Sequence, residues 1–163
     1  VAHNKRHFAA DILAANIGKF RIFAAEHKGY FVKISSLQSY YEENLKLLEK
    51  KKRDALFGSG HAIYTKVKDS APTRYGEKCV VKNSLIADGC EIEGEVYNSV
   101  IFRGVKIGKG TVVRDSVLMQ GTITGENSMI NCIITDKNVL IKDRRVLSGC
   151  KTHPFFVYKN SVL

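Results

Sequence analysis

The chain lacks several features that would place it in a common functional class. It has no apolar run near the about 18 residues that a membrane span needs, and no charged-then-apolar signal segment. It contains no G-x-x-x-x-G-K-[ST] loop, which argues against a P-loop nucleotide site. Its four cysteines form no C-x-x-C pair, so we expect a reduced, cytoplasmic protein with no membrane partner. Because the first residue is Val1 and not methionine, we expect a fragment or a processed product.

Negative charge is scarce. The 26 lysines and arginines outnumber the 16 aspartates and glutamates, which gives a net charge of +10. This excess predicts an anionic partner, unless a missing part of a longer chain balances it. Proteins that bind single-stranded nucleic acid combine basic residues with stacking aromatics. The repeats described next contain only Tyr97 and Phe102 as aromatics, so we predict no nucleic-acid partner.

Four stretches of the second half are near-copies of one another. Each opens with a large aliphatic residue, places Asn or Asp before Ser or Cys, and closes with two aliphatic residues. The copies are Val81–Ile86, Val96–Ile101, Val113–Leu118 and Met129–Ile134, which begin 15, 17 and 16 residues apart. Two further positions recur in phase: Gly89, Gly104, Gly121 and, in the fourth copy, Lys137; then Ile92, Ile107, Ile123 and Val139. Cys132 takes the place of the small Ser, which favours a packed thiol over a ligand or a disulfide.

A period of 15–17 residues predicts a mainly β fold, a parallel β-helix of the hexapeptide-repeat type. Stacked units bury a column of equivalent aliphatic side chains at the strand spacing of about 4.8 Å. The alternative is an antiparallel sandwich, whose turn signals recur every 8–12 residues. A sandwich does not explain an Asn–Ser pair at the same phase of successive units. The pattern alone leaves the handedness of the β-helix open.

The residues before the repeats have mixed helical and strand patterns. Residues 7–17 predict a short helix that stops at Gly18, and residues 21–25 and 30–34 predict two strands. A clearer helix follows, in which Ser35 and Gln38 have the spacing of a capping box. One side of this helix is apolar and is expected to be core: Leu37, Tyr41, Leu45 and Leu48. The basic run at residues 50–53 is expected to be a solvated face.

These segments resemble, in their order, a known family. Gly29–Ile34 and Ser39–Leu45 are similar to the end of the catalytic domain of bacterial glucose-1-phosphate adenylyltransferase (ADP-glucose pyrophosphorylase). Ile63–Asp69 and Pro72–Tyr75 are similar to its linker, and the repeats to its C-terminal left-handed β-helix. The resemblance implies three parts: residues 1–57 as the remnant of a nucleotidyltransferase-like domain, 58–75 as a linker, and 76–163 as a left-handed β-helix.

One position departs from the family in a way that bears on catalysis. Catalytic members have Gly-Tyr-Trp-x-Asp-Ile/Val-Gly-Thr here, and the Asp helps to hold Mg²⁺. In this chain Phe31 replaces the Trp, Lys33 replaces the Asp, and Ser35–Ser36 replace Gly–Thr. An ammonium group at about 4 Å from a cation costs roughly 4 kcal/mol per unit charge at an effective dielectric of about 20, and a metal ligand is lost. We therefore expect no catalytic residue, metal or cofactor in this chain, with Mg²⁺ belonging to a catalytic partner.

The resemblance then implies a GlgD-type regulatory or assembly subunit of ADP-glucose pyrophosphorylase in glycogen biosynthesis, itself non-catalytic. The implied partner is a catalytic adenylyltransferase subunit in a hetero-oligomer, a tetramer in this family; a homo-oligomer is the alternative. Two other functions stay open: an active sugar-phosphate nucleotidyltransferase whose metal ligand comes from elsewhere, and a purely structural β-helix module for oligomerisation.

Other chemistries found on hexapeptide β-helices depend on histidine. Acyl transfer needs a histidine base, and the carbonic anhydrases of this architecture need histidine ligands for their metal. None of the five histidines lies between Cys79 and Cys150, so the repeats are expected to carry neither chemistry.

Basic residues at the turns of the repeat are the candidate binding residues for an anionic metabolite effector. Members of the resembled family respond to sugar phosphates and phosphate, and arginine binds phosphate through two parallel hydrogen bonds. The candidates are Arg144, Arg145, Lys142, Arg103, Lys106 and Arg114. The adjacent pair Arg144–Arg145 is the strongest of them; for each residue the alternative is a solvent-facing charge. The connector before the repeats and the aromatic tail, residues 155–158, are expected to cover the open ends of the stack; coverage by a second subunit is the alternative.

Overall fold

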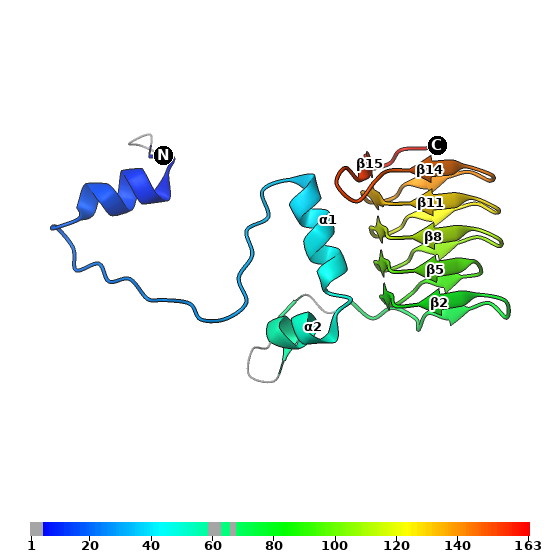
Figure 1. Cartoon of the computed structure of the whole chain (residues 1–163), viewed down its shortest axis with the longest axis horizontal. Coiled ribbons are helices and arrows are strands. Elements are labelled where there is room, and N and C mark those ends of the chain that lie inside the picture. The colour runs from blue at the N-terminus through cyan, green and yellow to red at the C-terminus, as the bar shows by residue number, and fades with distance from the viewer. Residues whose placement is uncertain (1–4, 59–62, 66–67) are drawn as a thin grey trace. The chain divides into compact units, whose positions relative to one another are not determined.

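The structure, a computed structural model, describes residues 5–58, 63–65 and 68–163. The chain divides into two compact units, Val1–Phe31 and Val32–Leu163 (Figure 1), and each is treated by itself below. No helix among the described residues is long and apolar enough to cross a membrane.

The described residues of the first unit contain one helix. The π-helix η1 (Phe8–Ala14) lies where residues 7–17 predict a helix, and Gly18 follows it with φ of 86°. The predicted strands at 21–25 and 30–34 are wrong, because both segments lack regular structure. A strand needs a neighbouring strand to bond its backbone, and neither segment has one among the described residues. Apolar side chains such as Phe23 and Phe31 are therefore exposed.

Three five-stranded parallel sheets form the β-helix of the second unit. Sheet 1 contains β1 (Arg74–Tyr75), β4 (Glu91–Ile92), β7 (Lys106–Ile107), β10 (Ile123–Thr124) and β13 (Leu140–Ile141). Sheet 2 contains β2 (Val80–Lys82), β5 (Glu95–Tyr97), β8 (Val112–Arg114), β11 (Met129–Asn131) and β14 (Val146–Ser148). Sheet 3 contains β3 (Leu85–Ile86), β6 (Val100–Ile101), β9 (Val117–Leu118), β12 (Ile133–Thr135) and β15 (Phe155–Val157).

The chain visits the sheets in the order 1, 2, 3 and returns to sheet 1, so each circuit is one coil of a β-helix (Figure 1). All strand pairs in the three sheets are parallel. The predicted hexapeptide-type β-helix is thereby confirmed, and the antiparallel sandwich is excluded. The aromatic tail does not cover the end of the stack, because β15 pairs with β12 and extends sheet 3.

The register corrects the alignment of the fourth copy. Val96 pairs with Val81 and Val113, and Val113 pairs with Ile130, not with Met129. The copies therefore begin 15, 17 and 17 residues apart, at positions 81, 96, 113 and 130. Cys132 consequently lies in register with Asp115 and not with the small Ser116.

The turn between sheets 2 and 3 explains this register. In the first four coils its equivalent residues have left-handed backbone: Asn83, Asn98, Asp115 and Cys132, with φ between 44° and 51°. Asn and Asp adopt this conformation more readily than other non-glycine residues. The same rule corrects the recurring glycine position between sheets 3 and 1. In the fourth coil the residue equivalent to Gly121 (φ 72°) is Asn138 (φ 58°), not Lys137. Equivalent positions of successive coils are therefore identified by their left-handed backbone. The similarity of Asn131–Cys132 to the Asn–Ser pairs of earlier copies is misleading.

Serine hydroxyl groups join successive coils next to these turns, and those of Ser99 and Ser116 are buried. The Ser84 Oγ accepts from the Ser99 amide at 3.2 Å, and the Ser99 Oγ accepts from the Ser116 amide at 3.1 Å. The Ser116 Oγ accepts in turn from the Ile133 amide at 3.1 Å. Each hydroxyl replaces a backbone carbonyl at a point where the strands bend, so the amides stay bonded inside the structure.

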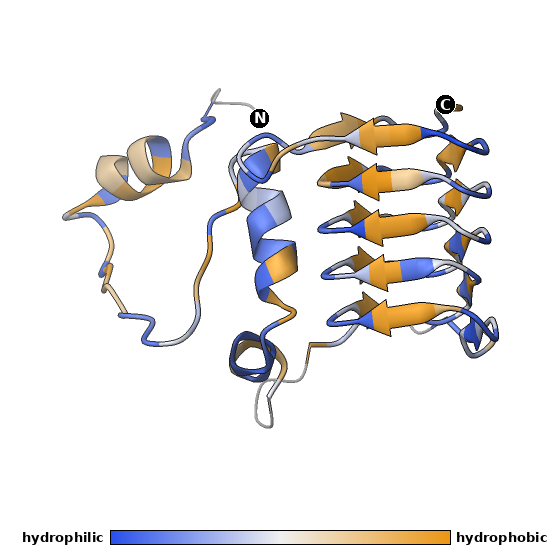
Figure 2. Cartoon of the chain, turned by 45° about the vertical axis from the view of Figure 1, so that its right-hand side comes forward, coloured by the Kyte–Doolittle hydropathy of each residue, from blue (hydrophilic) through white to orange (hydrophobic). Residues whose placement is uncertain are grey.

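The core is a set of stacked aliphatic columns. Ile92 and Ile107 occupy one column, which continues with Thr124 and Ile141 in place of the expected Ile123 and Val139. Apolar residues fill the strands and hydrophilic residues the turns (Figure 2). Burial of each such aliphatic side chain contributes roughly 1.5–3 kcal/mol, so the column supplies much of the stability of the β-helix.

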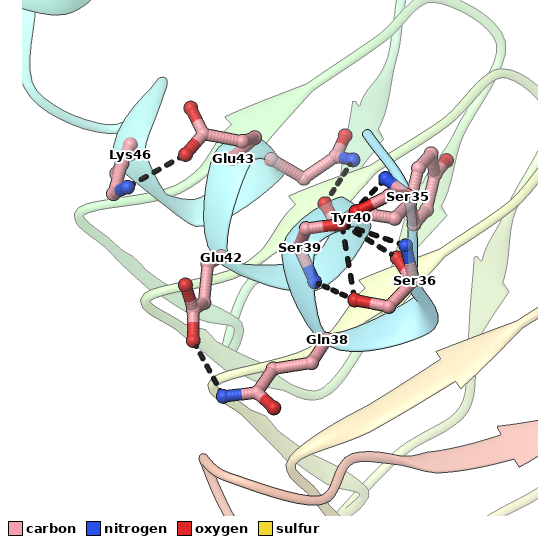
Figure 3. A network of polar contacts seen from close by, with 9 residues as sticks. Ser35, Ser36, Gln38, Ser39, Tyr40, Glu42, Glu43 and Lys46 are labelled. Carbon is pink, nitrogen blue, oxygen red and sulfur yellow. Dashed lines mark hydrogen bonds and ion pairs between the residues drawn. The ribbon is translucent and has the colours of Figure 1, made fainter. Parts of the chain in front are cut away.

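Helix α1 (Leu37–Lys46) is capped by Ser36, one residue after the predicted cap at Ser35. The Ser36 hydroxyl accepts from the Ser39 amide at 3.0 Å, and the Ser39 hydroxyl accepts from the Ser36 amide at 2.9 Å (Figure 3). The Gln38 side chain donates to Glu42 at 2.9 Å and takes no part in the cap. Ser39 can replace the usual Glu because its hydroxyl reaches back to the same amide.

Tyr41 fixes α1 on sheet 3. Its ring is 1% exposed and packs against Val100, Val117 and Ile134. Its hydroxyl donates to the Asp115 carbonyl at 2.5 Å, in the left-handed turn described above. Burial, followed by contact with Cys132, raises the pKa of this hydroxyl. Docking of α1 thus depends on one buried aromatic and one hydrogen bond.

The rest of the predicted apolar side of α1 is uneven. Leu45 and Leu48 are partly buried against the same cluster, but Leu37 is 50% exposed. The basic run begins a second helix, α2 (Lys50–Phe57), and does not end the first. Arg53 is not merely solvated, because its Nη1 donates to the carbonyls of Leu47 and Leu48 at 2.8 and 2.6 Å. The compact unit that begins at Val32 thus contains α1, α2 and the β-helix, and the boundaries at residues 57 and 75 stay predictions.

Replacement of Tyr41 by phenylalanine tests the docking of α1. We expect Tyr41→Phe to lower the free energy of unfolding by about 1 kcal/mol, because the Asp115 carbonyl loses its donor. A raised pKa in the folded state means that the hydroxyl stabilises the fold fully below its unfolded pKa of about 10. The difference between wild type and variant should therefore shrink above about pH 10 in urea titrations.

The control is Tyr64→Phe, because the Tyr64 side chain is 94% exposed. This change should leave the free energy of unfolding within about 0.5 kcal/mol at every pH. Equal stability of Tyr41→Phe and wild type at pH 7 would contradict the role given to the hydroxyl.

Candidate functional site

Three of the six basic candidates share one turn near the C-terminal end of the stack. Lys142, Arg144 and Arg145 lie between β13 and β14, and all three side chains are exposed. The Arg144 amide donates to the Glu126 carbonyl at 2.8 Å, and the Arg145 amide donates to the Ser128 Oγ at 3.1 Å. The backbone of this turn, called the cationic turn below, is therefore held by the coil before it.

Arg144 has a backbone conformation that arginine rarely adopts. Its φ is 56°, and the equivalent positions of earlier coils are Gly110 (φ 67°) and Asn127 (φ 53°). Left-handed backbone costs an ordinary residue roughly 1–2 kcal/mol. The fold thus tolerates strain at Arg144 that glycine or asparagine would reduce.

Arg145 follows it in the place of a buried hydroxyl. Its amide bonds to Ser128 as the Ser128 amide bonds to Thr111 Oγ1, at 3.1 and 3.0 Å. Thr111 and Ser128 are fully buried, whereas Arg145 is exposed. Burial of a guanidinium at the position of these two hydroxyls would carry a large desolvation penalty, so the Arg145 side chain points into solvent.

The structure does not bring the other three candidates to this turn. Arg103 lies in the turn between sheets 3 and 1, and Lys106 lies on the outer face of sheet 1, where its Nζ is 2.8 Å from Glu91 Oε1. The Arg114 guanidinium lies 4.2 Å from the centre of the Tyr97 ring on the outer face of sheet 2. Lys106 and Arg114 therefore already have partners within the chain.

Lys33 lies in an exposed segment without regular structure, just before α1. Among residues 5–58, 63–65 and 68–163, no three His, Cys, Asp or Glu side chains gather in a way that would hold a metal ion. Nothing among the described residues of the second unit therefore assigns a metal to the residues around Lys33.

The four cysteines are free thiols. Cys90 and Cys132 are buried, so the expectation of a packed thiol at 132 is confirmed, although its slot differs. Cys150 is exposed, and a hydrogen bond with Thr152 lowers the pKa of its thiol. No disulfide joins them.

Apolar side chains flank the cationic turn on both sides. On sheet 1 the outward residues next to it are Ile123, Leu140 and Val162, and on sheet 2 they are Met129 and Val146, which are 59% and 72% exposed. We call these five residues the apolar flanks. The repeat pattern alone could not reveal them, because it does not say which aliphatic of each strand points outward until the register is known.

Residues 67–151 match the family model described as "GlmU-like, C-terminal hexapeptide". This match covers more than half of the chain. The chain belongs to this hexapeptide family. Membership agrees with the parallel coils, since the matched residues include every strand from β2 to β14.

Relatives with assigned names extend beyond the β-helix. The "Glycogen biosynthesis protein GlgD" of Bacillus subtilis (strain 168) is 39% identical over 137 residues, which cover 84% of this chain and 40% of that protein. The protein of the same name from Geobacillus stearothermophilus is 46% identical over 119 residues, 73% of this chain and 35% of the relative. A "Glucose-1-phosphate adenylyltransferase" of Thermosipho melanesiensis is 37% identical over 107 residues, which cover 66% of this chain and 26% of that protein.

The resemblance to the adenylyltransferase family, and to its GlgD type, is thereby confirmed. The hexapeptide chain spans less than half of the length of these relatives. What they do as whole proteins therefore bears on this chain only through the proposals below.

Replacement of Arg144 by asparagine separates strain from function. We expect Arg144→Asn to raise the free energy of unfolding by up to about 1 kcal/mol, because asparagine tolerates left-handed backbone better. The matched control is Arg145→Asn, since Arg145 is not among the residues with positive φ. Urea denaturation should show a gain for the first variant alone, and a loss of stability in Arg144→Asn would mean that the guanidinium itself supports the fold.

Proposed function

We propose that the chain is part of a regulatory or assembly subunit of ADP-glucose pyrophosphorylase, acting in the cytoplasm in glycogen biosynthesis and not catalytic itself. The observation that carries this proposal is Lys33, in a chain whose relatives include both GlgD proteins and adenylyltransferases. An ammonium at the position of a metal-binding carboxylate opposes the binding of Mg²⁺, on which phosphoryl chemistry depends.

The proposed partner is a catalytic glucose-1-phosphate adenylyltransferase subunit. The apolar flanks support an assembly role, because exposed aliphatic side chains that lie together on a surface are typical of protein interfaces. Met129 and Val146 are neighbours on sheet 2, in direct register, and both are more than half exposed. A partner that covers them would gain roughly 25 cal/mol for each Å² of apolar surface removed from water.

The cationic turn is the proposed site for an anionic effector such as a sugar phosphate. Lys142, Arg144 and Arg145 come from one short segment, and the Asp143 carboxylate between them already accepts from the Glu126 amide at 2.8 Å. An arginine that the chain retains despite strained backbone is typical of functional positions. Because the apolar flanks border this turn, an anion there would change the charge of the proposed interface.

The substitution Lys33→Asp in the full-length subunit tests the catalytic part of the proposal. We expect the unmodified subunit, without its partner, to form no ADP-glucose from ATP and glucose 1-phosphate in Mg²⁺. If Lys33 alone blocks the metal, Lys33→Asp restores measurable synthesis. Turnover of the unmodified subunit at about 1–10³ per second, the usual range for enzymes, would show instead an active nucleotidyltransferase.

Charge placed on the apolar flanks tests assembly. We expect the double variant Met129→Lys/Val146→Lys to weaken association with the catalytic subunit at least about tenfold, because two ammonium groups would need to be desolvated. Sedimentation of the mixed full-length subunits measures it. The control Val80→Lys lies in the same outward column at the opposite end of the stack and should associate normally. Unaltered association of the double variant would remove the flanks from the interface.

A further inference from the structure

A hollow of about 720 Å³ opens along the edge where sheets 1 and 2 meet, near the start of the β-helix. Three successive turns border it: the β1–β2 turn, the β4–β5 turn and the β7–β8 turn. This edge also carries the cationic turn, but that turn lies at the other end of the stack and lines no part of the hollow. The volume is within the range of small-molecule sites, about 300–1,000 Å³.

The hollow exists because the middle turn is short. Four residues join β1 to β2 and β7 to β8, at positions 76–79 and 108–111, but only Glu93 and Gly94 join β4 to β5. These two missing residues are the reason that the second copy follows the first after 15 residues and the later copies after 17. Figure 1 shows the loop that leads into β5 set back from those that lead into β2 and β8. We call the recess the notch.

The floor of the notch admits no larger residue. A Cβ atom at Gly94 would collide with the carbonyls of Thr111 and Gly108, so position 94 has to be glycine. Glycine at position 94 therefore lets the two-residue turn pack closely against the next coil, as Gly108 does against Gly125.

The charges around the notch cancel. Arg74, Lys78 and Lys109 are balanced by Glu77, Glu93 and Glu95 in a chain whose net charge is +10. Arg74 and Glu93 form an ion pair at 3.5 Å, and Glu95 accepts from the Tyr97 hydroxyl at 2.8 Å. The notch thus offers many donors and acceptors without a field that would attract an anion.

Tyr75 adds a flat apolar surface. It is in register with the buried Ile92, but β1 is the edge strand of sheet 1, so its side chain is 53% exposed and lines the notch. Aromatic rings give large contact area together with a polar hydroxyl. An aromatic face beside mixed donors and acceptors fits the apolar ring face and the hydroxyl groups of a sugar.

We propose that the notch is a binding site for a neutral carbohydrate. Tyr75 provides the surface on which a sugar ring stacks, and the side chains of Glu77, Glu93 and Lys109 bind its hydroxyl groups. The site is distinct from the proposed anion site, because it combines zero net charge with an aromatic face. The proposed carbohydrate site does not depend on the proposed function. Only the choice of glucans as probes rests on that function.

The test is a titration of the chain, labelled with ¹⁵N, with neutral maltotriose and cellotriose, and with inorganic phosphate for comparison. We expect saturable shifts of the amides of Gly76–Lys78, Gly94 and Lys109–Gly110 with at least one trisaccharide, at a Kd on the order of 1 mM. Phosphate should not shift these amides. Saturation by neither sugar, or saturation by phosphate alone at the same amides, overturns the proposal.

Variants give the proposal a structural test. Replacement of Glu93–Gly94 by the four residues Gly-Lys-Gly-Thr found at 108–111 should fill the notch, restore a 17-residue spacing and abolish binding. In case that change prevents folding, Tyr75→Ala should weaken binding at least fivefold, whereas Tyr158→Ala, at the other end of the β-helix, should not. Unchanged affinity in Tyr75→Ala overturns the stacking role. Association with the catalytic subunit is measured separately, so failure of the sugar site leaves the proposed function as it stands.

Discussion

Each coil of the β-helix is bonded to the next by parallel strands, and those bonds form only if equivalent residues of successive coils stay in register. Left-handed positions at the turns, two in each of the first two coils and three in each of the next two, keep that register, because each lets the chain turn from one sheet to the next within a few residues. Hydroxyls such as Ser99 and Ser116 then bond the amides that the bends leave without a strand partner. The aliphatic columns follow from these bonds, since they stack only when the turns place them above one another.

This constraint explains which parts of the fold the sequence predicts. The columns at Val81, Val96 and Val113 recur at the right phase, because their turns carry Asn or Asp in left-handed backbone. The fourth copy was shifted by one residue, since Cys132 is an unusual residue for that conformation and resembles a small Ser in sequence. The two strands expected before α1 failed for another reason: a strand pattern shows a tendency, whereas a strand exists only beside a partner.

The candidate site was predictable only in part. Sequence proximity placed Lys142, Arg144 and Arg145 together correctly, because a turn of four residues keeps its members close. It could not show that Lys106 pairs with Glu91 or that Arg114 lies over Tyr97, because both partners come from the preceding coil. The outer column of sheet 1 shows the same dependence on register, changing from Arg74, Glu91 and Lys106 to Ile123 and Leu140 along the stack. The first two copies begin only 15 residues apart, and this shorter spacing does indicate the notch. The structure is needed to show that the two residues are absent from the β4–β5 turn. Because each coil contacts only its neighbours, the surface of one coil can change without destabilising distant coils.

The helix cap does not explain the departure from the family pattern around Lys33. Ser36 now caps α1, but threonine at that position would cap a helix nearly as well, so the change from Gly–Thr to Ser–Ser gains little for the docking of α1. Tyr41, not the cap, holds the helix on sheet 3. The fold therefore gives no structural reason for a lysine at position 33.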